Sequence, residues 1–232
     1  GFAAVSTQPA AGAQGETTGL LMIRAWHRSR GEGERRRRVI VPDSAHGTNP
    51  ASVNLVGYQT VTIASEEHAT VDLDALRKAL DDRTAAVMLT VPNTLGLFES
   101  RVRDITRLAH QAGAQVYMDG ANLNALVGLV RPGDLGFDVM HINLHKTFST
   151  PHGGGGPGAG PVVLSAALAP FAPAPWVVHH AGGFQLVEEA ADEAAQAFGR
   201  MSAFHGQMGM FVRAYAYTRS HGAEGRRVAE AG

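Results

Sequence analysis

Apolar and polar residues alternate along this chain in short blocks, and polar or glycine-rich turns separate the blocks. Continuous or alternating apolar runs predict β-strands at residues 2–7, 39–41, 60–63, 84–90, 115–118, 138–143 and 161–164. Helical patterns with cap or stop residues predict helices at residues 17–29, 72–80 and 102–111. Strands that alternate with helices are typical of an α/β domain with a mostly parallel sheet and helices on both faces.

Polar residues gather in the turns that directly follow the strands. Residues 42–52, 91–96 and 119–122 are such turns, and the strand at 138–143 leads into His145, Lys146 and a glycine-rich loop. In an open α/β sheet, ligands bind at the edge formed by the carboxyl ends of the strands. The sequence therefore predicts a site along one edge of the sheet.

The pattern changes near residue 188. From Glu188 to Arg219 it becomes helical, with a break at Gly206. We therefore expect a larger α/β domain over residues 1–187, followed by a helical segment over residues 188–232 that leads toward a further domain. The chain opens without a methionine, and we expect it to be an internal piece of a longer protein.

Composition argues against several classes of function. The 232 residues carry a net charge of -1 and no cysteine, which excludes disulfides, cysteine-ligated zinc and a thiol nucleophile. The arginine run at residues 35–38 leads directly into an apolar strand, so we interpret it as a solvated loop. We see no apolar run of membrane-spanning length and no signal peptide. We expect a cytoplasmic protein without a nucleic-acid or membrane partner.

Candidate chemistry lies at three positions along the predicted edge. The small-residue turn around Gly12 leads into a helix whose first backbone N–H groups can bind an anion. Asp119 ends one strand, and Lys146, a residue type that can act as an amine nucleophile, follows another. Pyridoxal phosphate requires an anion site for its phosphate, a carboxylate for its ring nitrogen and a lysine for its aldehyde. The three elements together indicate such a site, and His46 is placed to stack on the ring.

Each element also has an ordinary structural interpretation. Taken alone, a lysine after a strand is a solvated surface residue, and Asp119 and His46 are turn residues satisfied by their neighbours. The turn at Gly12 is then a plain turn into a helix. His141 and His145 have the i, i+4 spacing of some metal ligands, but their segment is predicted to be a strand entering a loop. Without an acidic third ligand nearby, we predict no metal site.

Several long motifs resemble one family. They are residues 8–16 (QPAAGAQGE), 45–52 (AHGTNPAS), 117–125 (YMDGANLNA), 131–134 (RPGD) and 143–148 (NLHKTF) with the glycine loop that follows. These motifs resemble the P-protein of the glycine cleavage system, a fold-type I pyridoxal phosphate enzyme that acts as glycine dehydrogenase (decarboxylating). The resemblance covers nearly the whole chain, through Tyr217, and residues 9–12 and 148–152 most resemble subunit 2 of the two-subunit bacterial form.

The resemblance implies a role for each candidate residue. Lys146 forms the Schiff base with the cofactor, Asp119 pairs with the pyridinium nitrogen and His46 stacks on the ring. The backbone of Gly12, Ala13 and Gln14 faces the phosphate, and the further implied contacts of the cofactor are Thr94, Ala121, Asn143 and His145. The implied reaction is loss of CO2 from glycine and transfer of the remaining aminomethyl group to the lipoyl disulfide of H-protein.

The same resemblance implies partners and reveals departures. The protein is expected to pair with subunit 1 in a heterotetramer with two copies of each subunit, and to act with glycine and lipoylated H-protein. Ala11 stands where many one-chain relatives carry a hydroxyl, and Val91 replaces a more polar residue. Family members carry an N-terminal segment before this region and a C-terminal domain after it. We therefore expect the chain alone to bind the cofactor poorly or to be inactive.

Two other functions stay open. One is another fold-type I enzyme, such as an amino-acid decarboxylase or a hydroxymethyltransferase, although the stretch from His145 to Phe148 with its glycine loop argues against it. The other is a cofactor-free scaffold subunit that only pairs with a partner, which subunit 1 of the two-subunit form resembles. Lys146 and Asp119 together favour the catalytic subunit.

Overall fold

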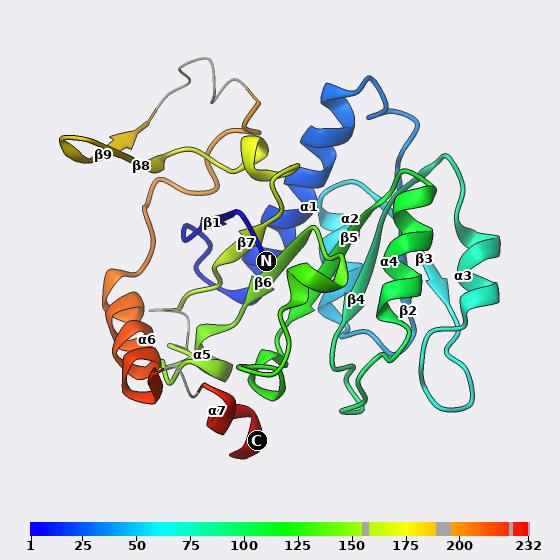
Figure 1. Cartoon of the computed structure of the whole chain (residues 1–232). Helices are drawn as coiled ribbons and strands as arrows, with labels where there is room; N and C mark the ends of the chain where they lie inside the picture. Colours follow the sequence, from blue (N-terminus) through cyan, green and yellow to red (C-terminus); the bar gives the residue numbers. More distant parts are fainter. Residues whose placement is uncertain (155–157, 189–195, 223–224, 232) are drawn as a thin grey trace.

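A computed structural model of the chain describes residues 1–154, 158–188, 196–222 and 225–231. Within these residues, the main sheet contains seven strands in the order β1-β7-β6-β5-β4-β2-β3 (Figure 1). The strands are β1 (Ala4–Ser6), β2 (Arg38–Pro42), β3 (Gln59–Ile63), β4 (Thr84–Thr90), β5 (Gln115–Gly120), β6 (Val139–Ile142) and β7 (Val162–Leu164). Every predicted strand is present, and its bounds agree with the prediction to within about two residues.

Most neighbouring strands of this sheet are parallel. β3, β2, β4, β5 and β6 run in the same direction. β7 runs antiparallel to both β6 and β1, so β1 again points the same way as β6. All strands except β7 therefore end at one edge of the sheet, which confirms the prediction of a mostly parallel sheet.

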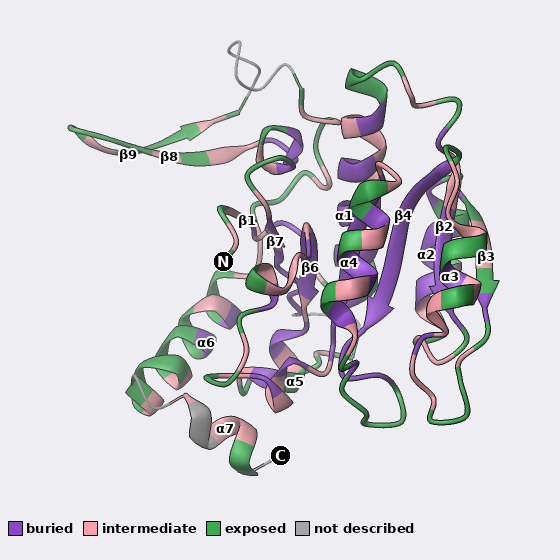
Figure 2. Ribbon diagram, turned by 45° about the vertical axis from the view of Figure 1, so that its right-hand side comes forward, coloured by how far each residue is buried: buried purple, intermediate pink, exposed green. Residues whose placement is uncertain are grey.

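Helices cover both faces of the sheet. α1 (Gly12–Ser29) and α2 (Thr48–Leu55) pack on one face, and α3 (Leu73–Ala79) and α4 (Val102–Gln111) pack on the other. Side chains of a strand alternate between the two layers. Val39 and Val41 pack in the layer that contains α1, whereas Ile40 packs in the layer that contains α3 and α4. β4 is buried at every position because both of its faces are covered, and Figure 2 shows it buried along its length.

The predictions for α3 and α4 are confirmed. The Asp72 carboxylate caps α3 by accepting hydrogen bonds from the backbone N–H groups of Asp74 and Ala75 at 2.8 and 3.0 Å. α4 ends at Gln111, and Gly113 follows it with a φ of +76°, a conformation that glycine adopts without strain.

Two predictions need correction, the start of the first helix and the assignment of residues 42–52 entirely to a turn. α1 begins at Gly12 rather than at Thr17, because Gly12 and Gly15 are helical positions that lie close against Asn143 and His141. A Cβ at Gly15 would lie 2.9 Å from the Cβ of His141, so only glycine allows this approach. α2 was not predicted, since the polar stretch after β2 has too few apolar residues to show a helical period.

The C-terminal part of the chain differs most from the prediction. An antiparallel hairpin of β8 (Trp176–His180) and β9 (Gly183–Val187) projects from the body and is largely exposed (Figures 1 and 2). Residues 196–207 were expected to be helical and are not, because Gly199 and Gly206 adopt φ values of +115° and +107°. Residues 189–195 of that predicted segment lie outside the described residues. The proposed boundary between domains at residues 187 and 188 stays a prediction.

Short elements complete the fold around the end of β6. α5 (Leu144–Thr147) follows β6, and α6 (Met208–His221) covers it, with Met210 and Ala214 packed on Leu144. The remaining elements are the 3-10 turns η1 (Leu123–Ala125), η2 (Pro132–Leu135) and η3 (Ala169–Phe171), and the helix α7 (Arg226–Ala231). Among the helices that the structure describes, none combines the length and the apolar character needed to cross a membrane.

Candidate active site

The candidate site lies at the edge of the sheet where the parallel strands end. Because β1, β2, β4, β5 and β6 all finish at this edge, the segments that follow them meet there (Figure 1). These segments contain the start of α1, the loop before α2, the loop after β4, Asp119 with the turn after it, and Asn143 with α5. Every predicted site residue belongs to one of them, as the sequence predicts for an open α/β sheet.

Asp119 is held by three hydrogen bonds in the interior. Its side chain is 1% exposed; Oδ1 accepts from His141 Nε2 at 3.1 Å and from the Ala121 N–H at 2.9 Å, and Oδ2 accepts from Asn49 Nδ2 at 2.9 Å. Burial raises the pKa of the carboxyl, but these hydrogen bonds, led by that of His141, outweigh burial and lower the pKa to about 2. Within the described residues Oδ2 has a single donor, so the ionised group can accept one further hydrogen bond, such as that of a protonated ring nitrogen.

His141 links Asp119 to the strand beside it and to α1. Its ring is buried, and Nδ1 lies 3.0 Å from the hydroxyl of Tyr117, which in turn lies 3.2 Å from the carbonyl oxygen of Gly15. Burial raises the pKa of Tyr117 well above its ordinary value, so the hydroxyl keeps its proton. These contacts join β5, β6 and α1, and they fix the position of the Asp119 carboxylate.

A second buried carboxylate, Glu16, lies on α1 and faces α2. Its Oε1 accepts from the Thr48 hydroxyl at 2.6 Å and its Oε2 from the Ser52 hydroxyl at 2.8 Å. Glu16, Asp119 and His141 each place one possible metal-binding atom within 4.8 Å of the others. All these oxygen and nitrogen atoms already take part in hydrogen bonds within the protein, so we describe the group as a polar network. His145, the second histidine of the i, i+4 pair, does not belong to this group.

His46 lies in the loop before α2 and is exposed. Its backbone N–H points to the Thr90 hydroxyl at 3.2 Å, and Thr90 in turn donates to Asn49 Oδ1 at 3.1 Å. Asn49 also donates to Asp119, so hydrogen bonds connect the backbone of His46 to that carboxylate. The ring nitrogen Nδ1 of His46 lies 2.7 Å from the Thr48 hydroxyl.

The start of α1 offers backbone donors. The N-cap residue Ala11 provides no side-chain hydrogen bond, and among the described residues no acceptor binds the N–H groups of Gly12, Ala13 and Gln14, so these groups can bind an anion. The backbone of Gly12 touches the Asn143 amide so closely that no Cβ would fit there, and Asn143 Oδ1 is buried without a hydrogen bond in the described structure. Gln14 turns back and accepts from the Ala10 N–H at 2.6 Å, while Ala13 is exposed.

Lys146 lies on α5, four residues after β6, and its side chain is exposed. Next to it, the ring of His145 packs edge-on against the ring of His152, with centroids 4.4 Å apart. Burial, together with the charges of His152 and Lys146, lowers the pKa of His145. The lysine therefore stands beside a neutral ring at the same sheet edge as Asp119.

Two of the predicted contacts have other partners. The Thr94 hydroxyl donates to the carbonyl oxygen of Ser44 at 2.9 Å, which ties the loop after β4 to the loop after β2. The backbone N–H of Ala121 donates to Asp119 and is therefore used within the protein.

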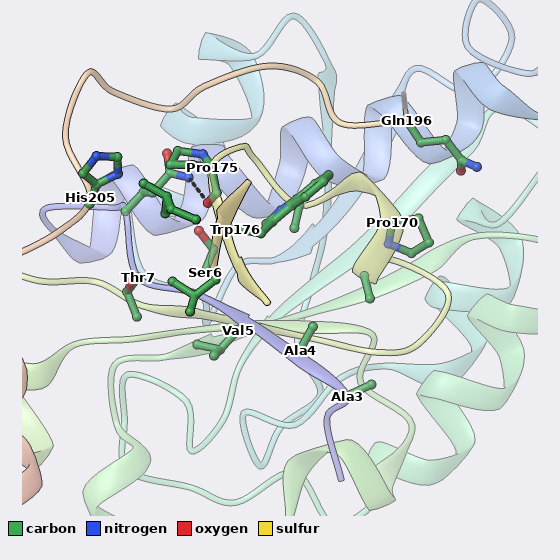
Figure 3. A pocket seen from close by; sticks show the side chains of 15 residues that line it. Ala3, Ala4, Val5, Ser6, Thr7, Pro170, Pro175, Trp176, Gln196 and His205 are labelled. Atoms are coloured by element: carbon green, nitrogen blue, oxygen red, sulfur yellow. Dashed lines mark hydrogen bonds between the residues drawn. The ribbon is translucent and has the colours of Figure 1, made fainter. Parts of the chain in front are cut away.

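A separate cavity of about 820 Å³ lies along β1, between that edge strand and the segment that leads into β8 (Figure 3). None of the predicted site residues lines it. Its walls include Val5, Pro170, Pro175, Trp176 and Leu186. The candidate site is therefore defined by its polar network and not by this cavity.

Sequence reasoning missed most of that network. Glu16, Thr48, Asn49 and Ser52 lie inside the quoted motifs, but no role was given to them, and His141 was considered only as a metal ligand. One signal was present: Glu16 is the single charged residue in a run of small residues at a predicted anion site. The partners of Asn49 and His141 depend on strand register, which the sequence does not show.

Solved structures with the same fold support this description. One is glycine decarboxylase (P-protein) of the glycine cleavage system in inhibitor-bound form, with a TM-score of 0.72 and 23% identity, covering 99% of this chain and 51% of that one. Another is TDC of Oryza sativa with PLP and tryptamine, with a TM-score of 0.67 and 16% identity, covering 97% and 46%. The class of fold is therefore fold-type I, as predicted.

Comparison of sequences gives the family. The aminotransferase class-V family model matches residues 14–156, more than half of the chain, and the chain belongs to that family. The probable glycine dehydrogenase (decarboxylating) subunit 2 of Caulobacter vibrioides is 65% identical over 99% of this chain and 44% of its own length. A protein of the same description from Thermus thermophilus is 54% identical, over 100% and 48%. The chain spans about half the length of the curated relatives it matches.

Proposed function

We propose that this chain carries the pyridoxal phosphate site of a glycine dehydrogenase (decarboxylating) and acts as its subunit 2. The observation that carries the proposal is the 65% identity to the Caulobacter vibrioides subunit 2 over 99% of this chain. The motifs at the start of α1, before α2, at Asp119 and around Lys146 all lie within the aligned part. The remainder of the relatives' length lies outside this chain, so the activity is proposed for the whole protein.

The residues of the site fit pyridoxal phosphate. The N–H groups at the start of α1 suit its phosphate, and Oδ2 of Asp119, which has one donor among the described residues, suits its ring nitrogen. Lys146 provides the amine for covalent attachment, and His46 provides a flat ring at the same edge. When bound, the cofactor accepts the electron pair that an amino acid releases as its carboxylate leaves as CO2.

The residues of this chain prepare that step electrostatically. A buried carboxylate with a pKa of about 2 stays charged at neutral pH, so Asp119 stabilises a proton on the ring nitrogen and keeps the ring a strong electron acceptor. The bonds from His141 and Asn49 prevent the carboxylate from turning away. The start of α1 holds the other end of the cofactor, because a phosphate is stabilised by the positive end of a helix.

The substrate and partners are proposed from the relatives. We propose glycine as the amino acid, and the lipoyl group of H-protein as acceptor of the aminomethyl group that remains after CO2 has left. We propose subunit 1 as the partner chain, in a heterotetramer with two copies of each subunit, in the bacterial cytoplasm.

The experiment uses the full-length chain with its partner subunit and pyridoxal phosphate. Borohydride should fix the cofactor irreversibly at Lys146, which peptide mapping identifies. The chain contains one other lysine, Lys78, which lies exposed on α3, so Lys78→Ala is a matched control that should label normally. Lys146→Arg keeps the charge and should abolish labelling. Label at any other position contradicts the cofactor site.

A second assay separates the reaction from the cofactor. Exchange of the glycine carboxyl group with labelled CO2 is expected for the native complex and not for Lys146→Arg. A complex that labels at Lys146 but releases CO2 from a different amino acid, and not from glycine, would be another fold-type I decarboxylase. That result would retain the cofactor site and reject the proposed substrate.

A further inference from the structure

Glu16 is a buried carboxylate, and it has none of the roles in cofactor binding that are proposed above. It is 2% exposed, and in the part of the chain that the structure describes no arginine, lysine or histidine nitrogen lies within 4.0 Å of its oxygens. Its partners are two hydroxyl groups of α2, those of Thr48 and Ser52. A buried charge is expensive unless it is hydrogen-bonded, so α1 and α2 meet around a group that needs these donors.

Thr48 connects this carboxylate to His46. Its hydroxyl oxygen lies 2.6 Å from Glu16 Oε1 and 2.7 Å from His46 Nδ1, and both distances correspond to full hydrogen bonds. A threonine hydroxyl has one hydrogen, and a carboxylate can only accept. When Glu16 is ionised, the hydrogen of Thr48 therefore points to Glu16, and the contact with His46 then requires a hydrogen on Nδ1.

One contact competes with this arrangement. The backbone N–H of Thr48 also points at His46 Nδ1, at 3.2 Å, and it would need that nitrogen to be bare. If Nδ1 were bare, the single hydroxyl hydrogen of Thr48 would have to serve both Glu16 and His46. With Glu16 ionised, the two shorter contacts require a hydrogen on Nδ1, and the hydrogen bond to an ionised group is the stronger type.

We propose that Glu16 is a positioning residue that acts through Thr48 to hold the neutral ring of His46 in the tautomer with hydrogen on Nδ1. Nε2 is then a bare acceptor. The importance of this tautomer for a reaction rests on the proposed function, in which His46 faces the cofactor. A bare Nε2 can accept a hydrogen bond or a proton from the amino group of an amino acid, whereas the other tautomer would present a donor there.

The tautomer can be read directly from nitrogen NMR spectra. The full-length chain with its partner subunit is labelled with ring-15N histidine, stripped of cofactor and measured in the solid state at a pH of about 8.5, where histidine is ordinarily neutral. Loss of a signal in His46→Gln assigns His46. We expect the Nδ1–H form to predominate. Predominance of the Nε2–H form in the native protein would overturn the proposal without any further variant.

Two variants test the route through Thr48. Thr48→Val keeps the shape but removes the hydroxyl, which leaves the competing backbone N–H unopposed, so the ratio of Nδ1–H to Nε2–H should fall about tenfold. Thr48→Ser restores a hydroxyl and should restore the native ratio. An unchanged ratio in Thr48→Val contradicts the relay.

Ser52→Ala is the matched control, because it removes the other hydroxyl donor from the same carboxylate and does not touch His46. It should leave the tautomer ratio of His46 unchanged. An equal shift in Ser52→Ala and Thr48→Val would mean general loosening between α1 and α2 and would overturn the proposal. The readout needs no cofactor, so a failure to label Lys146 rejects the proposed function and leaves this result standing.

Discussion

Asp119 and His141 lie directly opposite each other on the parallel strands β5 and β6, and their side chains form a buried hydrogen bond of 3.1 Å. Both side chains are 1% exposed. A buried carboxylate is stable only when donors compensate the loss of water, and His141 contributes the strongest of the three donors here. The strand register therefore determines the charge of the residue that we place against the cofactor ring.

The first prediction concerns acid stability. Asp119 has a folded pKa of about 2, below the roughly 3.9 of an unfolded aspartate, so its contribution is present above pH about 4 and is lost as the pH falls toward 2. Asp119→Asn should lower the free energy of unfolding by about 2–3 kcal/mol at pH 6, and the difference should narrow by about half near pH 3. Urea unfolding at both pH values measures this.

The control for this prediction is Asp82→Asn, since Asp82 is an exposed aspartate whose side-chain carboxylate lies 3.8 Å from Arg35. Its replacement should change the free energy of unfolding by less than about 1 kcal/mol at either pH. A stability difference between Asp119→Asn and the native protein that stays constant from pH 6 to pH 3 would contradict the assigned pKa.

The sheet was predictable because its strands carry strong local signals. β4 is a continuous apolar run that both layers bury, and the Asp72 cap and Gly113 mark where helices start and stop. The start of α1 was not predictable in this way, because its glycines allow the helix to lie close against the sheet. That contact is a tertiary property, and helix propensity alone counts such glycines as breakers.

The site was predictable as a set of positions but not as a network. Asp119 and Lys146 stand at strand ends, which the sequence pattern locates. The bonds of Asp119 to Asn49 and His141 join residues 70 and 22 positions apart, and they depend on the order and register of the strands. Glu16 lies within one of the motifs, but its partners are on α2, whose polar sequence shows no helical period, so the sequence does not reveal them.

The second prediction tests the contact between the glycine loop and α1. A Cβ at Gly160 would collide with the backbone of Ala11, which cannot move without shifting the start of the helix. Gly160→Ala should lower the free energy of unfolding by about 1–3 kcal/mol and weaken binding of pyridoxal phosphate. Calorimetry and cofactor titration measure the two effects.

Gly209→Ala provides the comparison for that variant, because Gly209 lies in α6 with open space around its Cβ position. Alanine is a better helix former than glycine by about 1 kcal/mol, so this variant should be as stable as the native chain or more stable. Equal destabilisation by both changes would show that the Gly160 contact is not specific.

The third prediction concerns the loop that carries Thr94. Asn93 is 9% exposed; its Oδ1 accepts from the N–H groups of Leu95 and Leu97, each at 3.0 Å, and its Nδ2 donates to the carbonyl oxygen of Ala69 at 2.9 Å. Asn93→Ala removes all three bonds and should destabilise the loop by about 1–3 kcal/mol. Hydrogen exchange at the amides of Leu95 and Leu97 should then accelerate.

Asn93→Asp separates the hydrogen bonds that Asn93 accepts from the one that it donates. The carboxylate can still accept from Leu95 and Leu97, whereas the bond to Ala69 is lost. Protection of the two loop amides should therefore persist in Asn93→Asp and disappear in Asn93→Ala. Identical protection in the two variants would mean that the loop is ordered by something other than this side chain.

The last prediction concerns His110 on α4, whose Nε2 lies 2.7 Å from Asp138 Oδ2. The hydrogen bond and the negative charge of Asp138 outweigh burial and raise the pKa of His110 above 6.5. A histidine whose pKa is higher in the folded state stabilises the fold. This contribution is fully present below the pKa of the unfolded state, roughly 6.5, and is lost as the pH rises through the pKa of the folded state. Because His110 is 40% exposed, solvent screens the pair and the effect should be only about 0.5–1 kcal/mol.

His110→Gln removes the titrating group while keeping a hydrogen-bond donor. Relative to the native protein, it should lower the free energy of unfolding at pH 5.5 by more than it does at pH 8.5, about 0.5–1 kcal/mol more. His179→Gln is the control, because His179 is exposed on β8 and no carboxylate in the described residues lies within 4.0 Å of it. Urea unfolding of the three proteins at both pH values measures this. If His110 forms an ion pair with Asp138, the loss of unfolding free energy in His110→Gln depends on pH, whereas that in His179→Gln does not; equal behaviour of the two variants would contradict the ion pair.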